Sequence, residues 1–316
     1  MRIKILESLN EGNFVSGETL AKKLNVSRTA IWKQIKILQK FGYRIESVKN
    51  KGYRLISRPD VPIFEEITEG LNTKIIGKKI FYFKTIDSTN IYAKKLVKDG
   101  VEEGTIVVSD VQKSGRGRKN RFWFSPKGGL WFSVILYPNI PPQNSMLVTM
   151  ASSVAVAQGI FETTGLTPII KWPNDLLINK KKVCGILTEL DAEMDKINYS
   201  VVGIGLNVNN EIDDNLKNVA TSLTKETKVN ISRVKLLRAI IKNFDENYSK
   251  LIARDYDSIR KDWFSYANII GRIVRVSDER SIIEGLVTDV DENGCLIVNT
   301  SKDTIKVVNG DLMILN

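Results

Sequence analysis

The first sixty residues carry apolar side chains at the spacing of three short helices, followed by two alternating strands. Helices are expected over residues 2–10, 16–24 and 28–42. Ser27 caps the third helix, and its buried stripe consists of Ile31, Ile35 and Leu38. Two alternating runs around a basic tip at residues 49–51 predict a β-hairpin. This order is typical of a winged helix-turn-helix domain.

Residues 61–268 mix strand-like and helical runs without the strict alternation of a doubly wound fold. The pair Val61–Pro62 interrupts regular structure and marks the start of this segment. Strand-like runs outnumber helical ones, which predicts an α+β domain around a mixed sheet. From Gly271 short alternating strands follow one another, as in a small β-barrel. We therefore expect three domains, at 1–60, 61–268 and 269–316.

Basic residues are concentrated in the first of these domains. The chain has 47 Lys plus Arg against 36 Asp plus Glu, a net charge of +11, and 13 basic and 5 acidic residues lie within positions 1–60. A winged helix places its recognition helix in the major groove while the hairpin tip meets phosphates. The alternative is a basic docking domain that does not bind DNA. Operator DNA is expected to contact Lys22, Lys23, Ser27, Arg28, Thr29, Lys33, Lys36 and Lys51.

The chain has no histidine, which excludes every mechanism that needs an imidazole. Ser-His-Asp and Cys-His catalysis and histidine-ligated metal sites are ruled out. Cys184 and Cys295 are too few for a disulfide framework, so we expect apolar packing roles in a reducing compartment. We find neither a signal peptide nor an apolar run of about 18 residues, which predicts a cytoplasmic protein without a membrane span.

The most unusual segment is a loop of glycines and cations, GRGRKNR, at residues 115–121. Glycine loses much conformational entropy on folding and the like charges repel, so the loop is costly to order alone. We expect it to order around a triphosphate or an acyl phosphate bound by arginine side chains. A mobile basic surface loop and a contact with nucleic acid are the alternatives. The loop is not a Walker A motif, and GIGLNV at 203–208 lacks the third glycine of the dinucleotide fingerprint.

A second candidate segment covers residues 171–187. Pro173 fixes a turn after a strand and presents Asn174 and Asp175 at its end. Lys182 precedes the apolar run VCGIL, which makes its side chain a candidate for the site. The alternative is a hairpin with a solvated lysine tip.

Four separated motifs resemble those of biotin-protein ligases. They are IDSTN at 86–90, GRGRKNRFWFSPKGGLWFS at 115–133, KWPNDLLINKKKVCGILTE at 171–189 and GIGLNVN at 203–209. The N-terminal domain makes the chain similar to the bifunctional members that also repress the biotin operon. The resemblance covers the whole chain and implies a class II synthetase-like central domain and an SH3-like C-terminal barrel.

The resemblance implies a two-step reaction. Biotin's carboxylate attacks the α-phosphate of MgATP to give biotinyl-5′-adenylate and pyrophosphate, and a lysine of a carrier protein then attacks the mixed anhydride. The implied catalytic residues are Lys182 and Arg118. Biotin is implied to contact Ser88, Thr89, Asn90, Gln112, Arg116, Gly117, Arg118 and Lys182. The nucleotide is implied to contact Arg121, Trp123, Asn174, Asp175 and Asn207, with Asp175 also near Mg²⁺.

The implied partners are the biotin carboxyl carrier protein of acetyl-CoA carboxylase, related biotin enzymes, and operator DNA bound by an adenylate-stabilised homodimer. The sequence departs from the family in two places. Asn120 stands where a loop glycine is usual, and asparagine tolerates positive φ better than most residues. The ending GDLMILN lacks the arginine that related proteins can place near ATP, so no ATP contact is assigned there. A ligand-responsive repressor without turnover and a lipoate or octanoate ligase are the alternative functions.

Overall fold

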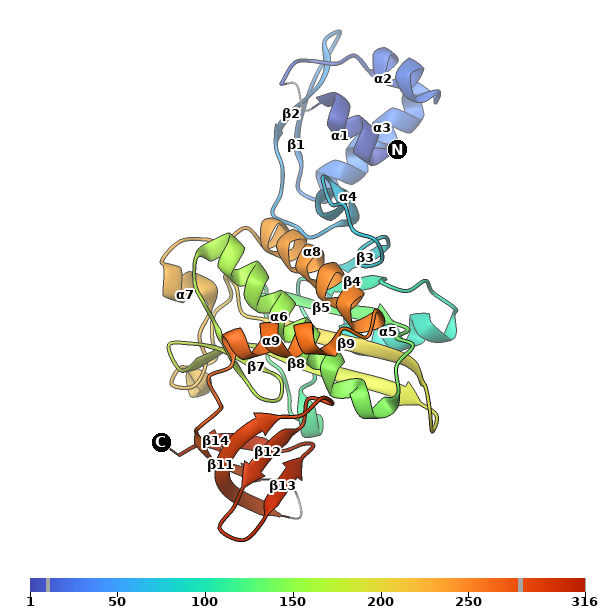
Figure 1. The fold of residues 1–316 in the computed structure, drawn as a ribbon. Helices are drawn as coiled ribbons and strands as arrows, with labels where there is room; N and C mark the ends of the chain where they lie inside the picture. The colour runs from blue at the N-terminus through green and yellow to red at the C-terminus, as the bar shows by residue number, and fades with distance from the viewer. Residues whose placement is uncertain (10–11, 278–280, 316) are drawn as a thin grey trace. The chain divides into compact units, whose positions relative to one another are not determined.

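The computed structural model describes residues 1–9, 12–277 and 281–315, which fall into two compact units (Figure 1). Unit 1 is Met1–Gly70 and unit 2 is Leu71–Asn316. The short helix α4, Phe64–Thr68, belongs to unit 1, whereas the C-terminal strands share a unit with the central sheet.

Unit 1 has the predicted winged helix-turn-helix architecture. Ser16 and Ser27 cap α2 and α3, because each hydroxyl accepts a hydrogen bond from the backbone N–H three residues further on. The apolar stripe of α3 is buried as expected, and the predicted last residue of α1, Asn10, lies outside the described residues. The elements are α1 (Arg2–Leu9), α2 (Gly17–Leu24), α3 (Arg28–Lys40), β1 (Arg44–Val48) and β2 (Gly52–Ser57).

Unit 2 is built on a seven-stranded sheet in the order β3-β4-β5-β9-β8-β7-β6. Strands β3 and β4 pair in parallel and every other pair is antiparallel, which confirms the mixed sheet. The strands are β3 (Ile80–Phe83), β4 (Ile106–Ser109), β5 (Leu130–Leu136), β6 (Ile169–Lys171), β7 (Asp175–Ile178), β8 (Lys181–Ala192) and β9 (Ile197–Leu206).

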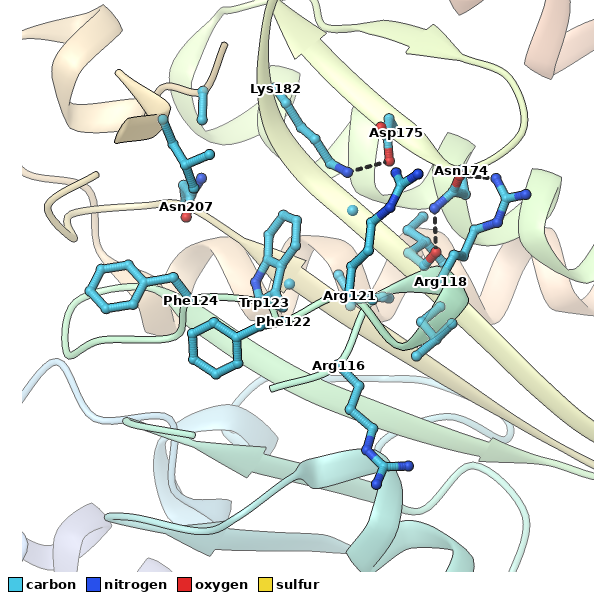
Figure 2. Close-up of a pocket in the computed structure, with 18 of the residues that line it drawn as sticks. Arg116, Arg118, Arg121, Phe122, Trp123, Phe124, Asn174, Asp175, Lys182 and Asn207 are labelled. Carbon is cyan, nitrogen blue, oxygen red and sulfur yellow. Dashed lines mark hydrogen bonds and ion pairs between the residues drawn. The ribbon is translucent and has the colours of Figure 1, made fainter. Parts of the chain in front are cut away.

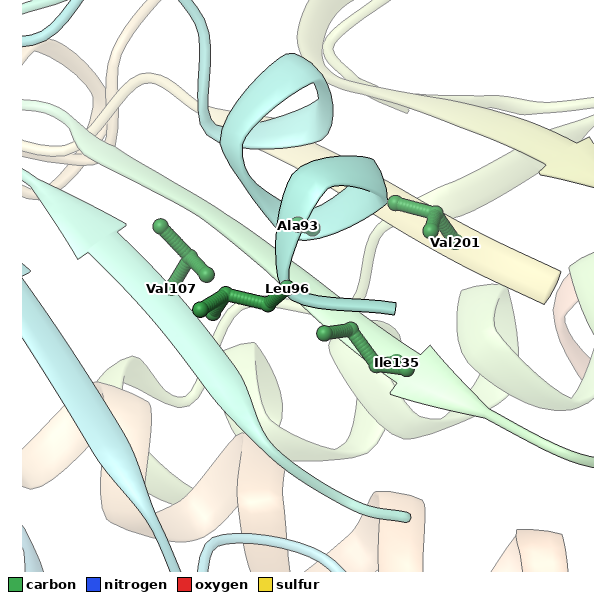
Figure 3. Packing of buried hydrophobic residues seen from close by; sticks show 5 residues of the cluster. All are labelled: Ala93, Leu96, Val107, Ile135 and Val201. Carbon is green, nitrogen blue, oxygen red and sulfur yellow. The ribbon is translucent and has the colours of Figure 1, made fainter. Parts of the chain in front are cut away.

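Helices cover both faces of this sheet, and β5 at its centre is buried at every residue. Helix α5, Thr89–Lys98, packs Ala93 and Leu96 against Val107, Ile135 and Val201 from three neighbouring strands (Figure 3). Helix α6, Ser145–Thr164, packs against α8, Arg233–Ile252, and α9, Tyr256–Tyr266 (Figure 1). The short elements are α7 (Leu223–Thr227), η1 (Arg118–Asn120), η2 (Pro142–Asn144) and η3 (Asp214–Leu216).

Helix α6 is the most apolar helix of the sheet domain. The segment Pro142–Thr164 is long and apolar enough to cross a membrane, but 72% of its most apolar window is buried inside the protein. It is the central core helix of the domain, which is why nearly all of its faces are apolar. Within the described residues it is the one helix that meets the length and composition of a membrane span.

The C-terminal strands form an antiparallel sheet of five, in the order β13-β12-β11-β10-β14. The turn before β12 contacts the core of the unit, because Trp172 Nε1 donates to the carbonyl of Gly294 at 3.2 Å. A side chain at Gly294 would overlap with Met146 and Met150. The strands are β10 (Ile273–Ser277), β11 (Ile282–Val290), β12 (Leu296–Asn299), β13 (Thr304–Val307) and β14 (Asp311–Ile314).

Three helices, α4, α7 and α9, and the strand β7 were not identified from the pattern of residues. Helices α4 and α9 are short and bury few apolar residues; α9 buries only Ile259 and Trp263. Asp175, expected at the end of a turn, is the first residue of β7. Both cysteines are free and buried, and burial raises the pKa of the Cys184 thiol, which fits the packing role expected for them.

Candidate active site

A cavity of about 510 Å³ opens over strands β8 and β9 of the central sheet. It is lined by six basic and four acidic side chains together with aromatic and amide groups. All thirteen residues that the sequence assigned to biotin and nucleotide lie along its wall, although they come from four separate segments. These residues are Ser88, Thr89, Asn90, Gln112, Arg116, Gly117, Arg118, Arg121, Trp123, Asn174, Asp175, Lys182 and Asn207. Figure 2 labels eight of them, from Arg116 to Asn207.

One end of the cavity is a network of buried hydrogen bonds around the start of α5. The backbone N–H and the hydroxyl of Thr89 both donate to Gln112 Oε1, at 2.8 and 3.0 Å. Ser133 Oγ lies 2.7 Å from Thr89 Oγ1 and 2.6 Å from Asn90 Oδ1. Asn90 Nδ2 in turn donates to Glu189 at 2.8 Å. These bonds fix the side chains before any ligand arrives, and Glu189 was not identified from the sequence.

Asn90 is buried and held on both sides of its amide, so its main effect is on the shape of the cavity. Its Nδ2 donates to Glu189 and to the Leu187 carbonyl, and Glu189 also pairs with Lys94 at 2.6 Å. Ser88 is as buried as Asn90, but its side chain makes no capping bond to α5. Its hydroxyl is therefore available to a ligand.

The glycine and arginine loop is folded over the cavity. Gly117 N–H donates to the carbonyl of Arg121 at 2.8 Å, and Trp123 N–H donates to that of Gly115 at 2.9 Å. Lys119 and Asn120 adopt φ values of 54° and 56°, in the left-handed region. Asparagine is one of the residues that best tolerates this region, so Asn120 replaces a glycine there without breaking the turn.

The loop finds its counter-charge in the C-terminal domain. Arg121 Nη2 lies 2.6 Å from Asp311 Oδ2, and Lys119 Nζ lies 3.3 Å from the same oxygen. Although burial opposes ionisation of Asp311, hydrogen bonds from these two cations hold its pKa below the usual range. The sequence predicted that the loop would order around an anion, and here a carboxylate of the chain itself supplies one.

Arg118 and Arg116 point in different directions. The guanidinium of Arg118 donates to Asn174 Oδ1 at 2.9 Å, to Asn309 and to the Gly310 carbonyl. Burial lowers the pKa of Arg118, so the site gains from an anion that offsets the lost hydration. Figure 2 shows the guanidinium of Arg116 directed away from this group.

Lys182, on β8, lines the same cavity. Its Nζ is 2.7 Å from Asp175 Oδ1 and 5.0 Å from the centre of the Trp123 ring (Figure 2). The aromatic face and the carboxylate hold the ammonium in place. The alternative interpretation, a hairpin with a solvated lysine tip at Lys180 and Lys181, fits Lys180 in part, since it is exposed in the turn between β7 and β8 but also lines the cavity. It does not fit Lys181, which is half-buried and donates to the Lys217 carbonyl at 2.9 Å. The same hairpin thus carries both an exposed lysine at its tip and a lysine, Lys182, in the cavity wall.

Three glycines leave the space that the site needs. A Cβ at Gly205 would lie 2.4 Å from Trp123 Nε1, and one at Gly203 would lie 2.1 Å from Asn90 Oδ1. A Cβ at Gly185 would meet Trp123 at 3.0 Å. The indole of Trp123 therefore rests directly on the backbone of β8 and β9. The alternating glycines of GIGLNV mark where β9 leaves space, but they do not show which side chain fills it.

The residues expected to contact DNA are all exposed in unit 1. Ser27 uses its hydroxyl to cap α3, and Lys22 pairs with Glu18 at 3.0 Å. Trp32 was not identified from the sequence; it is 50% exposed on α3, with Lys36 Nζ 5.9 Å from the centre of its ring. The recognition helix thus presents one aromatic ring among its cations.

Comparison with known proteins identifies each part of the chain. The "Biotin/lipoate A/B protein ligase family" matches residues 82–207, an "HTH domain" matches 2–54, and the "Biotin protein ligase C terminal domain" matches 269–311. The "Bifunctional ligase/repressor BirA" of Bacillus subtilis is 39% identical, and the alignment covers 99% of this chain and 98% of that protein. Its Escherichia coli namesake is 28% identical over 94% of this chain and 91% of its own length.

Comparison of the fold with solved structures also identifies biotin protein ligases. The biotin protein ligase from Aquifex aeolicus in complex with biotin and ATP matches with a TM-score of 0.65 and 29% identity, covering 75% of this chain and 98% of that one. Nearly full-length identity of 39% to a curated relative exceeds what a shared fold alone would give. The chain therefore belongs to the bifunctional ligase/repressor family of biotin protein ligases.

Proposed function

We propose that the protein joins biotin to a carrier-protein lysine through biotinyl-5′-adenylate. In the first step a biotin carboxylate oxygen attacks the α-phosphorus of ATP and pyrophosphate leaves. In the second step the lysine ε-amine attacks the biotinyl carbonyl, AMP leaves and an amide forms. The observation that carries the proposal is that one cavity brings the hydrogen-bonded start of α5 together with Arg118, Lys182 and Trp123.

The chemistry matches the residues available. Both steps need charge neutralisation and positioning, and neither needs a histidine. Ser88 and Gln112 would bind the polar groups of biotin, Lys182 would neutralise the carboxylate and α-phosphate, and Trp123 would flank the adenine. The roles of Asn174, Asp175 and Asn207 near the nucleotide are part of the same proposal.

Magnesium would enter with ATP as part of the substrate. Mg²⁺ is usually held by one or two carboxylates together with the substrate phosphates. Asp175 offers one carboxylate on the cavity wall, and among the described residues no group of three metal-binding side chains is present. This donor set fits a metal carried by the triphosphate better than a metal bound by the protein alone.

The test is to incubate the protein with biotin, MgATP and the biotin carboxyl carrier domain of acetyl-CoA carboxylase, and to weigh the acceptor. We expect a mass gain equal to biotin minus one water. Pyrophosphate release separates this function from a ligand-responsive repressor without turnover. Competition by lipoate and octanoate separates it from a lipoate or octanoate ligase. An acceptor of unchanged mass would reject the ligase function.

We also propose that residues 1–60 bind operator DNA, while residues 61–268 carry the ligase and 269–316 complete it. The exposed cations of α2, α3 and the hairpin tip support this division. The adenylate would act as corepressor by stabilising a homodimer that spans two half-sites. In this proposal the protein is cytoplasmic, and its remaining partners are biotin-dependent enzymes.

Lys33→Glu is expected to weaken binding to the promoter DNA of the biotin genes about tenfold and to lower the salt dependence by about one charge. Lys33 is exposed on α3, on the face opposite the buried stripe. Lys4→Glu makes the same charge change on the exposed face of α1 and serves as the matched control. Equal losses in the two variants would mean that net charge alone, not α3, directs binding.

Biotin together with ATP is expected to raise the affinity for the same DNA at least about tenfold, since typical allosteric couplings lie in that range. Mass photometry of the free protein should then show a larger dimer fraction when both ligands are present. Equal DNA affinity with and without the ligands would remove the regulatory part of the proposal and leave the ligase part intact.

A further inference from the structure

The last strand of the chain reaches the candidate active site. Asp311, the first residue of β14, lines the cavity and pairs with Arg121 and Lys119 of the glycine and arginine loop. The two residues before it, Asn309 and Gly310, accept hydrogen bonds from Arg118. Three of the four cations in the loop therefore contact a single short segment some 190 residues away in the sequence.

The C-terminal domain is held in place independently of these contacts. Asn144 Nδ2 donates to Asn293 Oδ1 at 2.9 Å, and Arg260 Nη2 donates to the Val290 carbonyl at 2.6 Å. The carbonyl of Gly294 accepts from Trp172, two residues before Asn174 in the cavity wall. These contacts do not involve the loop. The C-terminal domain therefore holds Asp311 in position whether or not the loop is closed.

Besides the contacts with residues 309–311, the loop is held over the cavity by the bond that Arg118 donates to Asn174 Oδ1 at 2.9 Å. Arg121 is 66% exposed, and the loop backbone makes only local bonds between its own two sides. Four like charges in seven residues repel one another, so an unpaired loop would open easily. A carboxylate at the rim removes part of this repulsion and joins the loop to the C-terminal domain.

We propose that Asp311 is a positioning residue that latches the loop over the cavity and thereby retains the adenylate intermediate until an acceptor lysine arrives. It acts through Arg121 and Lys119, and it takes part in no bond-making step. Retention matters because a mixed anhydride that escapes into water is lost to hydrolysis. The inference rests on the proposed ligase function.

The test measures how fast the adenylate leaves. The complex is formed from radiolabelled biotin and MgATP, freed of excess ligand, and chased with unlabelled biotin and MgATP. Asp311→Asn is expected to release label about five- to tenfold faster, the effect of losing two partly exposed charge pairs on one oxygen. Asp311→Glu should restore most of the slow release.

Asp303→Asn is the matched control, because Asp303 is an exposed carboxylate of the same domain whose side chain contacts no loop residue. In an Arg121→Gln, Lys119→Gln background, Asp311→Asn should cause little further acceleration, since its partners are gone. If Asp311→Asn does not fold, Arg121→Gln carries the same expectation from the loop side. Wild-type release rates in both variants would overturn the latch, whereas a wild type that forms no adenylate would reject the ligase function instead.

Discussion

Lys182→Ala is expected to slow formation of the adenylate by about 10²- to 10³-fold, the usual cost of removing one preorganised donor from developing charge. The ammonium is held between Asp175 and the ring of Trp123, so its position is set before substrate binds. Removing it also leaves the Asp175 carboxylate unpaired beside the incoming phosphates. Repulsion from that carboxylate adds to the loss of the cation.

The measurement is single-turnover release of pyrophosphate from biotin and MgATP with the protein in excess. Lys181→Ala is the matched control, because Lys181 precedes Lys182 on β8, donates to the Lys217 carbonyl and does not line the cavity. An unchanged rate in Lys182→Ala would exclude its side chain from the site.

Local patterns predicted most of the architecture. The cap at Ser27, the buried stripe of α3 and the mixed sheet follow from periodicity and turn residues, which act over a few positions. Asn120 is a finer example, since its expected tolerance of positive φ matches its φ of 56°. Helix α9 escaped prediction because a stripe of two buried residues gives almost no periodic signal.

Contacts between distant segments could not be predicted in the same way. Asp311 was assigned no role because its partners lie in a loop far back in the sequence. In the sequence Glu189 is indistinguishable from other charged strand residues, and only the fold shows that it accepts a hydrogen bond from Asn90. The GIGLNV motif showed its glycines without showing what occupies the space above them. Each of these roles depends on which side chain from a distant segment the fold places in contact. The spacing of residues along the sequence does not contain that information.

Gly205→Ala is expected to raise the KM for ATP about 100-fold, because a shift of about 1 Å in a positioning group can cost that much. The new Cβ would lie 2.4 Å from Trp123 Nε1, so the indole must move off β9. Trp123 also faces Lys182, and the ammonium loses its aromatic contact when the ring moves. The strand itself should persist, since Gly205 pairs regularly with Trp131 and Gly185 on its two sides.

Initial rates at varied ATP and a thermal melt separate damage to the site from damage to the fold. The decisive comparison is with Trp123→Ala, alone and combined with Gly205→Ala. If the clash with the indole is the cause, the double variant should be no worse than Trp123→Ala, because the new methyl group then meets empty space. Full additivity of the two substitutions would place the effect of Gly205→Ala in the backbone of β9 and contradict the role assigned to this glycine.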